Sequence, residues 1–249
     1  MAQPNAEVDW SGFDPEDYLR HNYAEVGAED RDLVGSAREF FGERCAGRSD
    51  LRGLDVGTGA NLYPALSMLP YCRSLTLYEH SPTNVAWLRE QVAAGWPSWS
   101  RAWGPFWALL AEHPAHAALA DPAAVLARRA EVVRGSVFDL DPAAGGWDVG
   151  TMFFVAESIS TERAEFTAAV RRFLGALRTG APFFLAFMEN SEGYEVGGVR
   201  FPAVRVDADD VADSLDGVAT EVVVGRARSD GGKVRDGYTG MVYAHGLAR

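Results

Sequence analysis

The chain has 249 residues, with 35 acidic against 23 basic side chains and a formal net charge of −12. Hydrophobic residues make up 47% of it, which indicates a globular protein. No apolar run reaches the ~18 residues that a membrane-spanning helix needs. The excess of carboxylates opposes binding to nucleic acid, because phosphate neutralisation needs clustered Lys and Arg. A neutral or cationic small molecule suits this charge better.

Cysteine and histidine usage argues against a metal or disulfide framework. The two cysteines, Cys45 and Cys72, are too few for either, and the five histidines form no HExxH pattern. We therefore expect no bound metal. The acidic N-terminal stretch has neither the basic start nor the apolar core of a secretory signal, so we expect a cytoplasmic protein. The sequence gives no indication of the oligomeric state.

Two helical patterns come first, at residues 15–24 and 29–44, and strand and helix patterns then alternate. The strand-like runs are 51–56, 74–79, 130–138, 147–155, 181–188, 220–227 and 239–246. The helical patterns between them are 62–69, 84–94, 162–177 and 208–215. This alternation predicts an α/β fold in which helices cover both faces of a mostly parallel sheet.

The last two strand-like runs have no helix between them, and Gly231 and Gly232 look like a turn. We expect an antiparallel hairpin at the sheet edge. A mostly parallel seven-stranded sheet with an antiparallel edge strand is typical of the Rossmann-like class I methyltransferases, which use S-adenosylmethionine. Fold alone does not decide function.

We expect one domain over residues 1–249, with a helical cap at 1–48 and insertions at 96–130 and 189–206. Insertions at strand ends are where α/β enzymes usually build their specificity pockets. The first insertion contains Trp96, Trp99, Trp103 and Trp107 at near-helical spacing. Indole faces can hold a cation, but such a stripe is more often core packing, which we favour.

A glycine turn, Gly57-Thr58-Gly59, follows the first strand and precedes a helix. Glycines there let the backbone approach a ligand and point N–H groups at it, although a purely structural turn is an alternative. The dinucleotide fingerprint needs a third glycine where Leu62 stands. The next strand ends at Glu79, whose carboxylate is placed to accept hydrogen bonds from a ribose, unless it is simply solvated.

Four segments together resemble the small-molecule amine N-methyltransferases typified by nicotinamide, phenylethanolamine and indolethylamine N-methyltransferases. They are FDPEDYLRHNY (13–23), LDVGTGANLYPALS (54–67), LYEHSPTNVAWLRE (77–90) and the weaker YEVGGVRFP (194–202). The resemblance covers nearly the whole chain. It is that of a divergent bacterial relative.

The resemblance implies a site for S-adenosylmethionine and a contact for each of its parts. It implies that Tyr18, Tyr23 and Tyr63 contact the amino-acid end and that Gly57, Thr58 and Gly59 form the backbone cradle. It further implies that Glu79 binds the ribose, that Asn84 contacts the nucleoside and that Ser136 and Val137 contact the adenine. Two positions depart from the family pattern. Glu79 stands in place of an aspartate, and Ser136-Val137 in place of an Asp-Val pair, for which Asp139 is a possible substitute.

Methyl transfer to an amine needs few catalytic groups, because positioning and electrostatics supply most of the acceleration. A carboxylate orients a cationic substrate and stabilises charge developing on nitrogen. The resemblance makes Glu157 and Glu189, at the ends of apolar strands, the predicted catalytic residues. Glu192 and Tyr194 are the predicted substrate contacts. For each glutamate the alternative is a solvated carboxylate.

Arg200 and Arg205 lie in the second insertion, beside the expected pocket, and would suit a substrate carboxylate, although surface arginines are the simpler explanation. The expected function is methyl transfer to a nitrogen of a small amine or guanidine. The alternatives are an O-methyltransferase and a non-catalytic S-adenosylmethionine-binding protein. A nicotinamide oxidoreductase fits less well, because the third glycine and a catalytic Tyr-x-x-x-Lys are missing.

Overall fold

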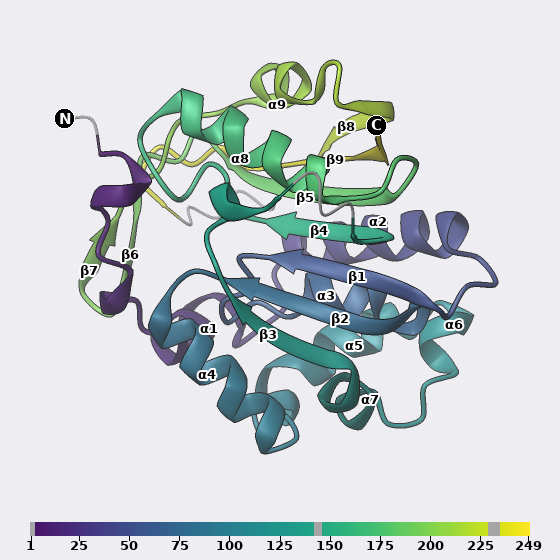
Figure 1. Cartoon of the computed structure of the whole chain (residues 1–249). Coiled ribbons are helices and arrows are strands. Elements are labelled where there is room, and N and C mark those ends of the chain that lie inside the picture. The colour runs from purple at the N-terminus through teal and green to yellow at the C-terminus, as the bar shows by residue number, and fades with distance from the viewer. Residues whose placement is uncertain (1–2, 142–145, 229–234) are drawn as a thin grey trace.

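The main sheet has seven strands in the order β3-β2-β1-β4-β5-β9-β8 (Figure 1). The computed structural model describes residues 3–141, 146–228 and 235–249. All seven predicted strands are present: β1 (Leu51–Val56), β2 (Cys72–Glu79), β3 (Ala130–Arg134), β4 (Val149–Phe153), β5 (Pro182–Glu189), β8 (Ala219–Arg226) and β9 (Gly240–Ala248). The strands β1 to β5 pair in parallel, as the helix and strand alternation predicts.

The hairpin at the sheet edge is confirmed as well. Strand β9 runs antiparallel to both β5 and β8 and lies between them, so β8 is the outermost strand. The burial of the two strands explains this order, because β9 is mostly buried along its length whereas the middle of β8 is exposed. The expected turn glycines, Gly231 and Gly232, lie outside the described residues.

Two layers of helices cover the two faces of the sheet, and alternate side chains of β5 pack against each layer. Its Phe183, Leu185 and Phe187 pack on one side, and the alternating Phe184 and Met188 pack on the other. The first side belongs to α8 (Arg163–Ala176) and α9 (Ala208–Leu215). The second belongs to α1 (Pro15–Tyr23), α2 (Ala28–Arg44), α3 (Tyr63–Met68), α4 (Pro82–Ala93), α5 (Gly104–Leu110), α6 (Pro114–Ala117) and α7 (Pro122–Arg129).

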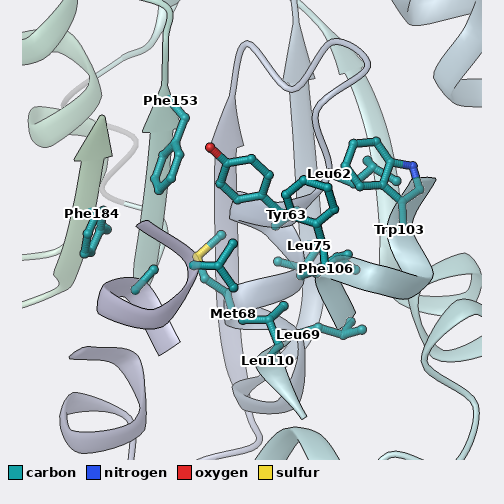
Figure 2. Packing of buried hydrophobic residues seen from close by; sticks show 14 of the residues in the cluster. Leu62, Tyr63, Met68, Leu69, Leu75, Trp103, Phe106, Leu110, Phe153 and Phe184 are labelled. Carbon is teal, nitrogen blue, oxygen red and sulfur yellow. The ribbon is translucent and has the colours of Figure 1, made fainter. Parts of the chain in front are cut away.

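The tryptophan-rich segment is core, as favoured from the sequence. Trp96 and Trp103 are fully buried, and a π-helical turn at Trp99–Trp103 leads directly into α5. Figure 2 shows Trp103 and Phe106 of this segment beside Leu62 and Tyr63, and Phe106 stacks on the Tyr63 ring at 5.1 Å between centroids. The insertion therefore supports the segment that follows the glycine turn.

The N-terminal segment and the second insertion meet beyond the carboxyl ends of the parallel strands (Figure 1). The insertion folds into a small hairpin, β6 (Tyr194–Val196) and β7 (Val199–Phe201), and Trp10 stacks on Phe201. Asp17 of α1 accepts a hydrogen bond from the Gly197 amide at 2.7 Å. Within the described part of the chain, no helix has the length and apolarity to cross a membrane.

Core packing in the first insertion gives a stability prediction. Trp103→Ala should lower the free energy of unfolding by about 3–5 kcal/mol, because a fully buried indole is replaced by a cavity. Val222→Ala on the exposed middle of β8 is the control and should change stability by less than about 0.5 kcal/mol. Urea denaturation followed by circular dichroism measures both, and a small effect at Trp103 would contradict its role in the core.

Candidate functional site

A cavity opens at the carboxyl ends of β1, β2 and β4, around the glycine turn, and is called here the Gly57 cavity. Its wall brings together residues that are far apart in the sequence. Lining residues include Trp10, Phe13, Tyr18, Gly57, Thr58, Gly59, Glu79, Asn84, Phe154, Ser158, Tyr194 and Arg235. Six of the site residues predicted for the cofactor thus border one cavity, together with Tyr194 from the predicted substrate contacts.

The glycine turn is built for close approach. Gly57 has φ +65°, and a Cβ there would lie 2.3 Å from Val155 Cγ2. Gly59 has φ +49°, and its Cβ would lie 3.3 Å from the Asn84 amide nitrogen. A side chain at either position would be strained and would crowd its neighbours. The turn therefore keeps its backbone open to the cavity.

Glu79 closes this cradle from the end of β2. One carboxylate oxygen accepts from the Gly59 amide at 2.7 Å and the other from the Ser81 amide at 2.7 Å. Burial raises the pKa of Glu79, and these backbone hydrogen bonds oppose the rise. Each carboxylate oxygen has a second lone pair, so the side chain can still accept hydroxyl groups from a ligand in the cavity.

Asn84 lies opposite, near the start of α4. Ser81 caps this helix by accepting from the Asn84 amide at 3.4 Å, which fixes where the asparagine emerges. The side chain is buried, and its Oδ1 has no hydrogen-bond partner within the described structure. A buried polar atom without a partner costs free energy. Its position on the cavity wall means that a bound ligand can supply the missing donor.

The three predicted tyrosines pack one behind another, and only the first of them reaches the Gly57 cavity. Tyr18 lines the Gly57 cavity, Tyr23 packs against it edge-on at 5.8 Å between centroids, and Tyr63 packs against Tyr23 at 6.0 Å. The Tyr63 hydroxyl donates to Asp30 at 3.1 Å. Of the three, only Tyr18 is on the described cavity wall, and the other two position it from behind.

Ser136 and Val137 lie beside this site but are not on the described cavity wall. Ser136 caps the short turn at Val137–Asp139, and the Asp139 carboxylate accepts from the Ser136 amide at 3.2 Å. Val137 is buried in the core on the α8 side of the sheet. The Tyr78 hydroxyl also donates to the Ser136 carbonyl. Their predicted contact with adenine stays a prediction.

Glu157 is completely buried just beyond β4. Its Oε1 accepts from the Met188 amide and from the Ser158 hydroxyl, both at 3.0 Å, while Oε2 has no partner among the described residues. Burial raises its pKa, and the Arg235 guanidinium acts in the opposite direction. The carboxyl group thus lies next to Ser158, which is on the cavity wall, but is not itself on that wall as described.

Glu189 and Glu192 have other partners. Glu189 Oε1 accepts two hydrogen bonds from Arg226, at 3.1 and 2.7 Å, and Oε2 accepts from Thr239 at 3.0 Å. This ties β5 to the β8–β9 hairpin. Glu192 is exposed and pairs with Arg205 at 3.0 Å. Neither glutamate is on the described wall of the Gly57 cavity, so the structure does not place them at the reacting groups.

A second cavity of about 370 Å³, called here the acidic cavity, adjoins the first. Phe154 lines both cavities and has φ +59°, a strained conformation of the kind that concentrates at functional sites. Two buried carboxylates at the start of α2, Glu29 and Asp30, lie on its wall. Sequence reasoning missed them, because acidic residues in a first helical turn normally just complement the helix dipole.

The acid pair is electrostatically unusual. Burial raises the pKa of Asp30 to about 7, the Tyr63 hydrogen bond lowers it and neighbouring Glu29 raises it further. Glu29 accepts a hydrogen bond from Tyr238 through Oε2, and its Oε1 has no partner in the described structure. Burying two carboxylates without a neighbouring cation costs free energy of folding, so this cavity is suited to a positively charged ligand.

Comparisons with known proteins agree with this geometry. The model of the NNMT/PNMT/TEMT family matches residues 5–244. No curated protein matches the chain.

Similar solved structures include N-methyltransferase NodS from Bradyrhizobium japonicum WM9 in complex with S-adenosyl-L-homocysteine, with 13% identity and a TM-score of 0.55 over 96% of this chain and 94% of that one. The 1,6-didemethyltoxoflavin-N1-methyltransferase of Burkholderia thailandensis has 15% identity and a TM-score of 0.52 over 88% and 80%. An O-methyltransferase family protein from the same organism has 15% identity and a TM-score of 0.50 over 86% and 55%. At these identities the likeness concerns the fold.

The wall of the Gly57 cavity carries polar groups that suit S-adenosylmethionine, the cofactor of this family. The open cradle at Gly57 and Gly59 suits its amino-acid end, Glu79 suits a ribose diol, and the unpartnered Asn84 oxygen suits a nucleoside donor. Tyr18 covers the cavity from α1. The residues present therefore suit the amino-acid and ribose parts of the molecule, and the contact with adenine stays a prediction.

Glu79→Gln tests this assignment. The amide group must turn its NH₂ toward one of two backbone N–H donors, so we expect binding of S-adenosylhomocysteine to weaken by about 10- to 100-fold. Glu131→Gln, on the exposed part of β3, should leave the Kd unchanged. Isothermal titration calorimetry measures both, and unchanged affinity of the Glu79 variant would remove the ribose role from this residue.

The Asp30→Asn variant tests how the stability of the fold depends on pH. Because the folded pKa of Asp30, about 7, exceeds its ordinary 3.8, ionisation of this carboxyl opposes folding. The penalty is absent below about pH 4, grows as the pH rises and is complete above about pH 7. The variant should therefore have a higher Tm than the wild type at pH 8 and an equal one near pH 4. Asp213→Asn, at an exposed position, is the control and should show no such pH-dependent gain.

Proposed function

Because the chain belongs to the NNMT/PNMT/TEMT family of S-adenosylmethionine-dependent methyltransferases, we propose that it methylates a nitrogen of a small-molecule amine. The acidic cavity is the observation that supports this choice. It adjoins the cofactor cavity at Phe154, and Glu25, Glu29 and Asp30 are on its wall. Among the described residues, no lysine or arginine lines this cavity. An ammonium group is the guest that such a lining favours.

Bound S-adenosylmethionine supplies a methyl group made electrophilic by its sulfonium. The chain has to bind the amine, exclude water and remove a proton, since an ammonium nitrogen has no lone pair. Glu29 and Asp30 bind the cation. The pKa of Asp30, raised by burial to about 7, suits a group that accepts the proton near neutral pH. Phe154 and Tyr23 supply the apolar wall that keeps the site dry.

Glu157 has an electrostatic role in this proposal. Its buried carboxyl group accepts from Ser158 on the wall of the Gly57 cavity, and in its ionised form it favours the positive charge that appears on the acceptor nitrogen. Glu189 has an indirect role in this proposal, because its carboxylate accepts hydrogen bonds from Arg226 and Thr239 and so holds them at the end of β5. Tyr194, whose hydroxyl donates to the Ser158 carbonyl at 3.2 Å, is the proposed contact for the body of the acceptor.

The experiment starts with the cofactor and then the acceptor. Calorimetry with S-adenosylhomocysteine, NADH and NADP should show one-to-one binding of the first alone. Mass spectrometry of reactions with panels of amines and of matched phenols and alcohols should then show a gain of one methyl group on amines. Methylation confined to hydroxyl compounds would establish an O-methyltransferase, and cofactor binding without turnover on either panel would favour the non-catalytic alternative.

Glu29→Gln should lower kcat/KM for the best amine by about 10- to 100-fold, because it removes a charged hydrogen-bond partner of the ammonium. Asp30→Asn should do the same and should also abolish the rise in kcat/KM through pH 7 that the wild type shows. Glu90→Gln on the exposed side of α4 is the control. An unchanged pH profile in Asp30→Asn would exclude this residue as the proton acceptor.

A further inference from the structure

Arg235 is a buried arginine on the wall of the Gly57 cavity, at 8% exposure. Its guanidinium carbon lies 4.4 Å from the centre of the Tyr194 ring, and Nη1 donates to the Ser158 hydroxyl at 3.2 Å. Arg235, Tyr18 and Tyr194 also line an outer cleft of about 770 Å³ that adjoins this cavity. The guanidinium therefore lies where cavity and cleft meet.

This cation has no ion-pair partner among the described residues, unlike Arg205 and Arg226, which pair with Glu192 and Glu189. Glu157 is joined to it indirectly, through the Ser158 hydroxyl, which donates to Glu157 and accepts from Arg235. A guanidinium has five N–H donors. Stacking on an aromatic ring leaves its edge free to bind a carboxylate with two parallel hydrogen bonds.

We propose that Arg235 binds a carboxylate of the methyl acceptor, so that the acceptor is an amino acid or a similar zwitterion. This rests on the proposed function, because the amine end is assigned to Glu29 and Asp30. The two ends share neighbours. Tyr238 donates to Glu29; burial and the acid pair raise its pKa, and Arg235 lowers it. Tyr18 lines the cavity beside Arg235; burial raises its pKa, Arg235 lowers it and Asp30 raises it. Tyr18 and Tyr238 therefore each lie near both the acid pair and the guanidinium.

Charge at the outer cleft limits the acceptor further. Asp17, Glu195 and Asp236 line the cleft together with Arg200 and Arg235. The three carboxylates and the net charge of −12 oppose an acceptor with two negative charges. A zwitterion has no net charge and meets complementary groups at both ends. Simple amines lack a carboxylate for the free edge of Arg235 and leave this buried cation with only its indirect link to Glu157.

The test compares three amino acids with their decarboxylated amines: tyrosine with tyramine, histidine with histamine and tryptophan with tryptamine. Calorimetry measures binding to the wild type and to Arg235→Gln, with and without saturating S-adenosylhomocysteine. The wild type should bind at least one amino acid about tenfold or more tightly than its amine, and Arg235→Gln should lose this preference. Arg235→Lys should keep part of it. Arg200→Gln, a cleft arginine that is exposed and faces Asp236, should keep it in full.

The cofactor also ends in a carboxylate, so its binding is measured separately. S-Adenosylhomocysteine has this group and 5′-methylthioadenosine lacks it. If Arg235→Gln weakens binding of the first but not of the second, Arg235 holds the cofactor and the proposal is overturned. Equal binding of acid and amine by the wild type, or no binding of any of the six, overturns it too. Tight binding of an amino acid without N-methyl product would leave this proposal standing and would remove the proposed function.

Discussion

The Glu79 carboxylate joins the two loops that form the cofactor site, by accepting from the amides of Gly59 and Ser81. Gly59 belongs to the turn after β1, and Ser81 caps the helix after β2, so one buried side chain sets the spacing between neighbouring strand ends. The charge is expensive to bury, and the two backbone donors offset part of that cost. The bridge therefore holds the glycine turn beside the start of α4, where Asn84 lies.

Buried carboxyl groups accumulate along the same edge of the sheet. Asp55, Glu79 and Glu157 are buried near the ends of consecutive strands of the sheet, and burial raises the pKa of each. Asp30 adds a fourth raised carboxyl from α2. Such a set destabilises the empty protein, and a cation in the site recovers part of that free energy. Both reactants of the proposed chemistry, a sulfonium and an ammonium, are cations, so the same field attracts them and repels nucleic acid or other polyanions.

The sheet and the cradle were predictable, because both are local in the sequence. Alternating strand and helix patterns determine the sheet, and the glycine turn with Glu79 twenty residues later determines the cradle. The acceptor side was not predictable, because it depends on partners brought together by the fold. Glu189, for example, pairs with Arg226, 37 residues away, a partner that no sequence motif indicates. Neither Arg235 nor the Glu29 and Asp30 pair belongs to a recognisable motif. Their burial, which gives them their chemistry, exists only in the folded chain.

Phe154 explains why the two halves of the site can remain distinct. Its backbone, at φ +59°, turns sharply after β4, and its amide donates to the Ala186 carbonyl of β5 at 2.7 Å. A bulky residue holds this strained conformation only where its surroundings enforce it. The strain places an aromatic ring between a cavity lined by cradle amides and one lined by carboxylates. In the proposed chemistry this apolar ring separates the cradle from the acid pair, so that sulfonium and ammonium would each have their own counter-charge, and an acceptor that also reaches Arg235 extends past the ring.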